Sequence, residues 1–202
     1  ILSILSGIID KSDGTINFKE NIKLAYMLQE DCLLPFRTVL ENCLIGLEFN
    51  NSLNEDNKNY VINLLKTYGL GNYINNYPNS LSGGMRQRVA LIRTLAVKPD
   101  ILLLDEALSA LDYQSRIAIA DDIYNIIKKE GKTAIMVTHD IGEAISMSDK
   151  VIVLTKRRDL WACRTIIDSA EFDHDQDLFD KVYAFQKDCK KLPRKNINIL
   201  YP

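Results

Sequence analysis

The sequence predicts an α/β fold, in which helices flank a mainly parallel sheet and a helical subdomain is inserted in the chain. Short apolar runs without polar alternation are typical of strands buried on both faces, and three such runs lie at residues 101–104, 133–137 and 151–154. Helical patterns separate these runs, and a long helical stretch from Thr38 to about Tyr77 interrupts the alternation. This order of elements is typical of a parallel sheet covered by helices.

The first segment, Ile1–Gly7, reads as the last turns of an apolar helix that ends at a glycine. No methionine starts it and no N-cap precedes it, so we expect the chain to enter in the middle of an element, that is, to be N-terminally truncated. Residues 15–18 are expected to be extended, and residues 22–28 to form a strand that ends at Gln29 and Glu30.

The next elements are predicted from helical spacing and from start and stop residues. Apolar residues at three- and four-residue spacing indicate helices between Thr38 and Gly69, with a polar connection over 50–59. Ser82 is a good N-cap for a helix that Pro99 must end. The later boundaries are a helix over 113–129 ended by Gly131, a capping box from Asp140 to Glu143, and a charged, irregular tail from Lys156.

These elements predict three parts of the chain. Residues 1–37 and 96–160 would form the α/β core, which is incomplete at its N-terminus. Residues 38–95 would form the helical subdomain, and residues 161–202 a C-terminal tail.

Composition excludes several classes of protein. The 202 residues hold 25 Lys and Arg against 27 Asp and Glu, a net charge of -2, which argues against a surface that grips polyanions and hence against a nucleic-acid partner. No apolar run approaches the roughly 20 residues of a membrane-spanning helix. The four cysteines are scattered without a CxxC pair, so we expect free thiols in a reducing compartment.

Polar residues follow three of the predicted strands: Gln29, the pair Asp105 and Glu106, and the run Thr138-His139-Asp140. Ligands in open α/β sheets sit beyond the carboxyl ends of the strands, so these residues suggest a site for phosphate and metal. Asp105 suits a Mg²⁺ ligand, and Glu106 suits a group that orients or deprotonates a water. The alternative is a strand that simply meets an acidic helix start.

Ser82, Gly83 and Gly84 stand at the start of a predicted helix. Two glycines there expose backbone N–H groups, and the helix dipole favours an anion at that end. The Ser82 hydroxyl could cap the helix or donate to a phosphate oxygen. A plain N-cap with a flexible turn is the alternative.

Taken together, these motifs resemble the ATP-binding subunits of ABC transporters. The resemblance rests on Leu81-Ser82-Gly83-Gly84-Met85-Arg86-Gln87-Arg88-Val89, which matches their signature motif, followed by the apolar strand and Asp105-Glu106. Three further landmarks stand in family order over residues 1 to 160: Gln29 of the Q-loop, Ser109-Ala110-Leu111-Asp112 of the D-loop, and the switch residue His139.

The resemblance implies a P-loop NTPase-like fold, ATP and Mg²⁺ as cofactors, and ATP hydrolysis coupled to transport. It implies that Asp105 and Gln29 help hold Mg²⁺ and the attacking water, that Glu106 is the catalytic base, and that His139 contacts the γ-phosphate. Ser82, Gly83 and Gly84 would close over a nucleotide bound mainly by a second ATP-binding subunit, in a homo- or heterodimer, and Asp112 would help join the two subunits.

A finer resemblance to the nitrate, sulfonate and taurine importer branch lies in the segment Leu33–Asn42 and in the Met-Arg-Gln-Arg form of the signature. It implies import of a small anion or of an organosulfur or nitrogen compound, membrane permease subunits, a substrate-binding protein, and a peripheral place on the cytoplasmic face of the cell membrane. The apolar Leu33-Leu34-Pro35-Phe36 segment could receive the permease's coupling helix, or could equally be core of the helical subdomain.

The sequence departs from the family in one large respect. The 202 residues contain no glycine-rich loop of the form G-x-x-x-x-G-K-[ST], whose N–H groups and lysine cradle the phosphates. We therefore expect a homodimer of this chain to bind ATP poorly and to hydrolyse almost none, although it could complete one site beside an intact subunit. Two other functions stay open: a catalytically impaired partner or gene fragment, and a soluble ABC ATPase outside transport. A smaller departure is Ala107, where proline is usual.

Overall fold

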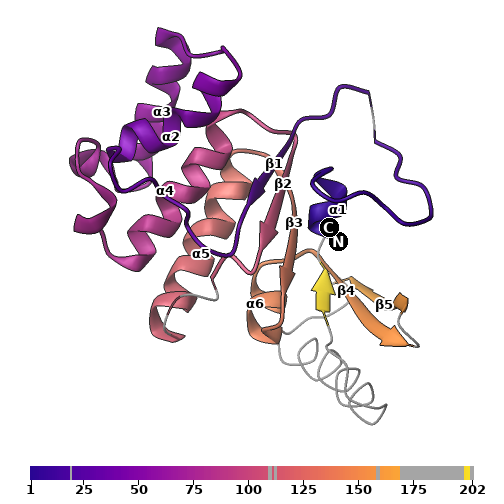
Figure 1. The fold of residues 1–202 in the computed structure, drawn as a ribbon. Coiled ribbons are helices and arrows are strands. Elements are labelled where there is room, and N and C mark those ends of the chain that lie inside the picture. Colours follow the sequence, from indigo (N-terminus) through magenta and orange to yellow (C-terminus); the bar gives the residue numbers. More distant parts are fainter. Residues whose placement is uncertain (19, 109–110, 112, 158–159, 169–197, 201–202) are drawn as a thin grey trace. The chain divides into compact units, whose positions relative to one another are not determined.

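The computed structural model describes residues 1–18, 20–108, 111, 113–157, 160–168 and 198–200 (Figure 1). The chain divides into two compact units, residues 1–133 and residues 134–202.

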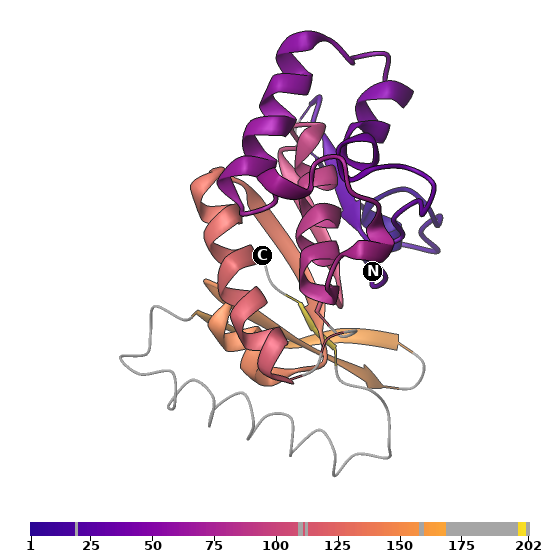
Figure 2. The same cartoon turned by 90° about the vertical axis from the view of Figure 1, so that its left-hand side faces the viewer.

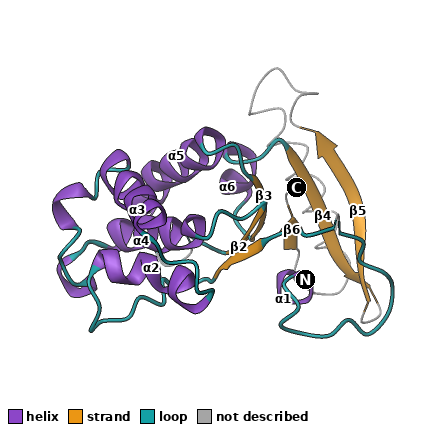
Figure 3. Ribbon diagram, turned by 90° about the horizontal axis from the view of Figure 1, so that it is seen from above, coloured by secondary structure: helices purple, strands orange, loops and turns teal. Residues whose placement is uncertain are grey.

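The first unit contains two parallel strands and most of the helices. Strand β1 (Leu24–Met27) pairs in parallel with β2 (Ile101–Asp105), with Leu24 opposite Ile101 and Met27 opposite Leu104. In Figure 3 the helices α2 to α5 lie on one side of β2 and α1 lies on the other. Their bounds are α1 (Leu2–Leu5), α2 (Val39–Phe49), α3 (Glu55–Thr67), α4 (Gly83–Ala96) and α5 (Tyr113–Lys129), with 3₁₀ turns η1 (Gly71–Tyr73) and η2 (Pro78–Ser80).

Caps fix where the helices of the first unit begin. Thr38 and Glu41 form a capping box at α2, in which the Thr38 hydroxyl accepts from the Glu41 N–H and the Glu41 carboxylate accepts from the Thr38 N–H. Asn54 caps α3 and Ser82 caps α4. The expectation of a polar connection over 50–59 is therefore wrong at its end, because the Asn54 side chain starts a helix at Glu55.

The core of the first unit lies where α4 packs against α2, α3 and β1 (Figure 2). Apolar residues of α4 and β2 supply it, because both elements are enclosed by neighbours. The fully buried members include Val89, Leu91, Ile92, Leu95, Leu102 and Leu103. The predicted helix that Ser82 caps and that ends before Pro99 is thus confirmed, and so are the predicted strands at 22–28 and 101–104, with strand bounds shifted by at most two residues.

A polar cluster joins α3 to the end of α5 within the first unit. The Tyr60 and Tyr68 hydroxyls both donate to the Glu130 carboxylate, at 3.2 and 2.9 Å. Burial, reinforced by the negative charge of Glu130, raises the pKa of Tyr60 to about 12 and raises that of Tyr68 as well. Gly131, at φ +61°, ends the helix as predicted.

The second unit holds an antiparallel sheet. Its strands are β3 (Thr133–Thr138), β4 (Lys150–Arg157), β5 (Leu160–Asp168) and β6 (Asn198–Leu200), in the order β3-β6-β4-β5, and α6 spans Ile141–Ser146. The expectation of an irregular tail from Lys156 is wrong through Asp168. Backbone pairing of β4 with β5 supplies the hydrogen bonds, and such a pairing tolerates charged side chains on a solvated face.

Two general expectations concern thiols and membranes. Cys32 and Cys43 are free, as predicted, and burial raises the pKa of Cys43 to about 12. Within the described part of the chain, no helix combines the length and apolar character needed to cross a bilayer. The expected boundaries of the three domains stay a prediction.

Candidate functional site

The turn after β2 carries two of the predicted site residues. Asp105 is the last residue of β2 and follows the buried residues Leu102–Leu104, so its carboxylate lies at the carboxyl end of a buried strand. Glu106 comes next with φ +45°, a left-handed conformation that is uncommon for a residue with a side chain. A non-glycine residue held there is a form of backbone strain that often occurs at functional sites.

The predicted residue Gln29 meets this turn. It lies two residues beyond the end of β1, and its Nε2 donates to Oε2 of Glu106 at 3.2 Å. Because β1 and β2 are parallel neighbours, their carboxyl ends lie at the same edge of the sheet. The structure thus brings Gln29, Asp105 and Glu106 together, as the sequence predicts for residues at neighbouring strand ends.

Tyr26 is a member of this cluster that sequence reasoning missed. Its hydroxyl donates to Oδ2 of Asp105 at 2.5 Å and lies 3.4 Å from Oγ of Ser3. Burial first, and then the hydrogen bond to Asp105, raise the pKa of Tyr26. The phenol therefore stays a neutral donor that orients the carboxylate. Its place on β1, three residues before Gln29, is the only sequence signal for this role.

The donor set at this edge suits a hard divalent cation. Asp105 offers a carboxylate and Gln29 an amide oxygen, and Mg²⁺ in phosphate sites is held by one or two such oxygens together with phosphate and water. No group of three or more His, Cys, Asp and Glu residues with metal-binding geometry occurs among the residues that the structure describes. A Mg²⁺ held here would take its remaining ligands from phosphate and water.

Ser82, Gly83 and Gly84 form the first turn of α4. The exposed Ser82 Oγ accepts from the Met85 N–H at 3.3 Å, which confirms the predicted N-cap. A Cβ on Gly84 would lie 2.0 Å from Cδ1 of Ile119 on α5, and one on Gly83 would lie 3.1 Å from Leu111. A side chain on Gly84 would therefore force Ile119 to move, so glycine permits the close approach of α4 and α5.

His139 belongs to the second unit, where it follows β3 and is exposed. The turn around it is held by side chains. The Thr138 hydroxyl donates to the Glu143 carboxylate and accepts from the Asp140 N–H at 3.1 Å, and Asp140 Oδ1 accepts from the Glu143 N–H at 3.0 Å. The Asp140 cap of the predicted capping box is therefore confirmed, whereas the Asp140 N–H, which the box would give to the Glu143 carboxylate, donates to the Thr138 hydroxyl. Of the D-loop residues, Ser109, Ala110 and Asp112 lie outside the described residues.

The segment after Gln29 is fastened to α4. Asp31 Oδ2 accepts from Arg86 Nε at 2.9 Å, and its Oδ1 accepts from the Leu33 N–H at 3.2 Å. The Arg93 guanidinium donates to the carbonyl oxygens of Asp31 and Cys32, at 2.7 and 2.8 Å. Sequence reasoning missed these contacts, because an arginine inside a helix gives no sign of which distant loop it contacts.

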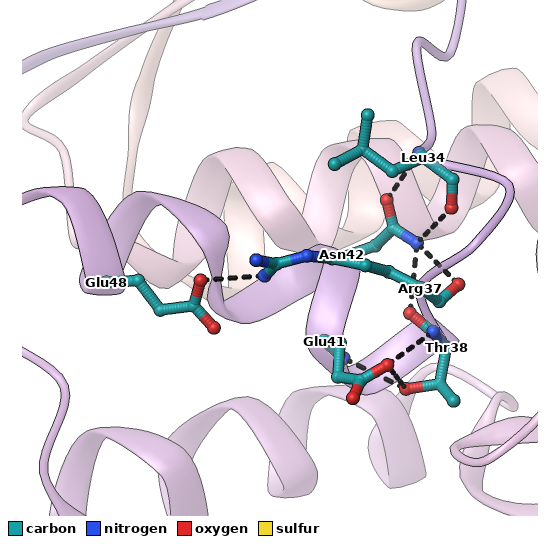
Figure 4. A network of polar contacts seen from close by, with 6 residues as sticks. All are labelled: Leu34, Arg37, Thr38, Glu41, Asn42 and Glu48. Carbon is teal, nitrogen blue, oxygen red and sulfur yellow. Dashed lines mark hydrogen bonds and ion pairs between the residues drawn. The ribbon is translucent and has the colours of Figure 1, made fainter.

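The Leu34–Thr38 turn is held by one buried side chain (Figure 4). Asn42 Oδ1 accepts from the Leu34 N–H, and its Nδ2 donates to the carbonyl oxygens of Leu34, Arg37 and Thr38. Phe36 at the tip of this turn is 73% exposed, whereas Leu33 is buried. The sequence left open whether the segment Leu33-Leu34-Pro35-Phe36 receives a coupling helix or belongs to the core. In the structure Leu33 is part of the core and Phe36 lies at the surface.

Comparison with known proteins gives one family and many relatives. Residues 1–109 match the family model described as ABC transporter. Over 164 residues the chain is 44% identical to the uncharacterized ABC transporter ATP-binding protein YtlC of Bacillus subtilis, covering 78% of this chain and 63% of the relative. It is 38% identical over 149 residues to the aliphatic sulfonates import ATP-binding protein SsuB 1 of Rhodococcus jostii, covering 74% of this chain and 57% of the relative. Other relatives are named for glycine betaine and proline betaine transport or for spermidine and putrescine import.

The fold has a counterpart among solved structures. A metal-chelate-type ABC transporter in an inward-facing conformation matches with a TM-score of 0.71 at 21% identity, covering 88% of this chain and 70% of that one. At this identity the likeness concerns the fold, and it confirms the predicted fold class. The chain spans 63% or less of the length of the two relatives described above.

Proposed function

The chain belongs to the ABC transporter family, and from this premise we propose that it is the ATP-binding and ATP-hydrolysing subunit of an importer. The observation that carries the proposal is the hydrogen bond from Gln29 to Glu106 beside Asp105, which gathers an amide and two carboxylates at one edge of the β1–β2 pair. Such a group suits the hydrolysis of a phosphate held beyond the strand ends.

In the proposed reaction each residue has a separate task. Asp105 and Gln29 would hold Mg²⁺, which neutralises phosphate charge when bound, and Tyr26 orients the Asp105 carboxylate. Glu106 would act as general base toward the attacking water, with Gln29 fixing its direction. His139 would contact the γ-phosphate. Asp112 would help join two ATP-binding subunits.

The first turn of α4 would serve a second nucleotide. We propose that Ser82, Gly83 and Gly84 close over ATP bound mainly by the partner ATP-binding subunit. Their support is the exposed hydroxyl of Ser82 at the N-terminus of a 14-residue helix, where N–H groups and dipole favour an anion. Weak ATP binding by this chain alone stays a prediction, which titration with Mg-ATP tests, and tight binding would contradict it.

The substrate of the proposed importer is a small anion or an organosulfur or nitrogen compound. The likeness to a sulfonate import ATP-binding protein supports this class, although the relatives include betaine and polyamine import proteins too. The proposal places the chain at the cytoplasmic face of the membrane, against permease subunits that work with a substrate-binding protein. The exposed Phe36, on a turn that Asn42 holds rigid, is the proposed contact for the permease.

A capture experiment tests this function. The immobilised protein is incubated with detergent-solubilised membranes of its own organism, and captured polytopic proteins are identified by mass spectrometry. We expect permease subunits to be captured, and Phe36→Glu to abolish the capture.

Phe49→Glu is the matched control, because Phe49 is 83% exposed at the other end of α2 and the proposal gives it no role. Capture of no permease by the unchanged protein would overturn the transport function. Equal loss with both variants would overturn the assignment of Phe36.

A further inference from the structure

Two arginines on α4 hold the segment after Gln29, and one of them, Arg86, also holds the loop before Ser82. Arg86 lies in the second turn of α4, and besides contacting Asp31 its NH1 donates to the Leu81 carbonyl at 2.9 Å. Leu81 is the residue before the Ser82 cap. One guanidinium therefore holds both the strand-end segment that carries Gln29 and the loop that starts α4.

The backbone of the strand-end segment is shaped for this attachment. Cys32 has φ +45°, so the chain takes a left-handed step directly after Asp31. The two neighbouring carbonyl oxygens, of Asp31 and Cys32, both accept from the single guanidinium of Arg93. A residue with a side chain costs free energy in this backbone conformation. The two hydrogen bonds from the charged Arg93 guanidinium offset that cost.

We propose that Asp31 is a positioning residue that couples Gln29 to Ser82, with Arg86 as its partner and Arg93 as the anchor of its backbone. The assignment rests on the proposed function for its meaning, since Gln29 would serve one nucleotide and Ser82 another. When Gln29 shifts, the short connection through Asp31 and Arg86 shifts the loop at Leu81, and the reverse holds too. The interaction energy of the Asp31–Arg86 ion pair, measured in a double-mutant cycle, tests this coupling.

Hydrogen–deuterium exchange on the full chain, without nucleotide, measures the coupling. Asp31→Asn keeps the size of the side chain and the acceptor for the Leu33 N–H, but removes the charge that faces Arg86. We expect exchange in peptides spanning 81–85 to become about fivefold faster, although these residues are 50 positions away in the sequence, because a half-exposed ion pair of good geometry is lost. The conservative variant Asp31→Glu should restore slow exchange.

Glu48→Gln is the matched control. Glu48 pairs with Arg37 at 2.7 Å with similar exposure, but touches neither Gln29 nor the start of α4. We expect it to leave exchange at 81–85 unchanged. In a double-mutant cycle, Asp31→Asn and Arg86→Gln should be strongly non-additive at these amides.

Additive effects, or faster exchange spread evenly over the first unit, would overturn the coupling. Failure of the proposed function gives a different result, because permease capture is scored separately on the unchanged protein. Non-additivity without capture would leave the coupling standing and remove the transport function. Capture without non-additivity would do the opposite.

Discussion

The turns after β2 and after β3 both present a predicted site residue beyond a strand end, but they are built differently. After β2, Glu106 is held by a left-handed backbone, with φ +45°, between the buried β2 core and the buried Ala107. After β3, His139 lies between Thr138 and Asp140, whose side chains fasten the turn to α6. One turn relies on backbone shape and the other on local caps, so they should respond differently to substitution.

The largest effect is expected at Thr138, which is 1% exposed and serves two hydrogen bonds of its turn. Thr138→Val keeps the shape but removes the hydroxyl from the buried carboxylate of Glu143. We expect the free energy of unfolding of the chain to fall by about 2 kcal/mol, measured by urea denaturation. Thr133→Val, at the exposed start of the same strand, should change it little. Equal losses would mean that the hydroxyl does not hold the turn.

The next largest effect should be a difference between the two units in their stability at alkaline pH. Tyr60 and Tyr68 are phenols with pKa values raised in the folded state, so their contribution to stability is complete below pH 10 and is lost as the pH rises toward about 12. The hydroxyl of Thr138 does not titrate in this range. We expect the first unit to lose amide protection between pH 10 and 12 before the second.

The control for this experiment is the double variant Tyr60→Phe and Tyr68→Phe. It is expected to be less stable at pH 8 and to lose less stability than the unchanged protein over the same window, the remaining loss coming from Cys43 and Tyr26, whose pKa values are also raised. Unchanged pH sensitivity in this variant would assign the alkaline loss to other groups.

A smaller effect is expected at the cap of α6. Asp140→Ala removes the oxygen that accepts from the Glu143 N–H, and should lower the free energy of unfolding by about 1 kcal/mol. Asp140→Ser retains a capping oxygen and should recover most of this loss in the same denaturation measurement. A Ser variant as unstable as the Ala variant would show that the cap is not what Asp140 contributes.

The smallest effect should have the opposite sign. Glu106→Gly relieves the left-handed strain, worth about 1 to 2 kcal/mol, but adds about 0.5 to 1 kcal/mol of chain entropy to the unfolded state. Against Glu106→Ala, which keeps the strain and loses the same hydrogen bond to Gln29, the glycine variant should be more stable by about 0.5 kcal/mol. An alanine variant that is the more stable of the two would contradict a strained turn.

Helix caps and apolar strands could be predicted from the sequence, whereas the backbone strain of single residues could not. The Asp140 and Ser82 caps, the apolar runs of β2 and β3 and the glycine after α5 follow from local chemistry within a few residues. The strain at Glu106 and Cys32 carries no such sign, because nothing in the residue type demands φ above zero.

Most contacts between distant segments could not be predicted from the sequence either. The proximity of Gln29 and Glu106 could be predicted from the sequence, because the topology of parallel strands places their ends at one edge. The contacts of Tyr26 and Asp31 could not be predicted, because their partners depend on which way a side chain points after packing. The strand β5 was missed for a related reason, since its pairing with β4 depends on backbone contacts rather than on apolar spacing.

The buried amide of Asn42 has a consequence for recognition. By fastening three carbonyl groups and one N–H, it gives the turn around Phe36 a fixed form before anything approaches. A surface that is already ordered loses little freedom on association, so its complexes need less contact area for a given affinity. A substitution of Asn42, which is fully buried beneath the turn, should therefore weaken the proposed docking through entropy while leaving Phe36 itself unchanged.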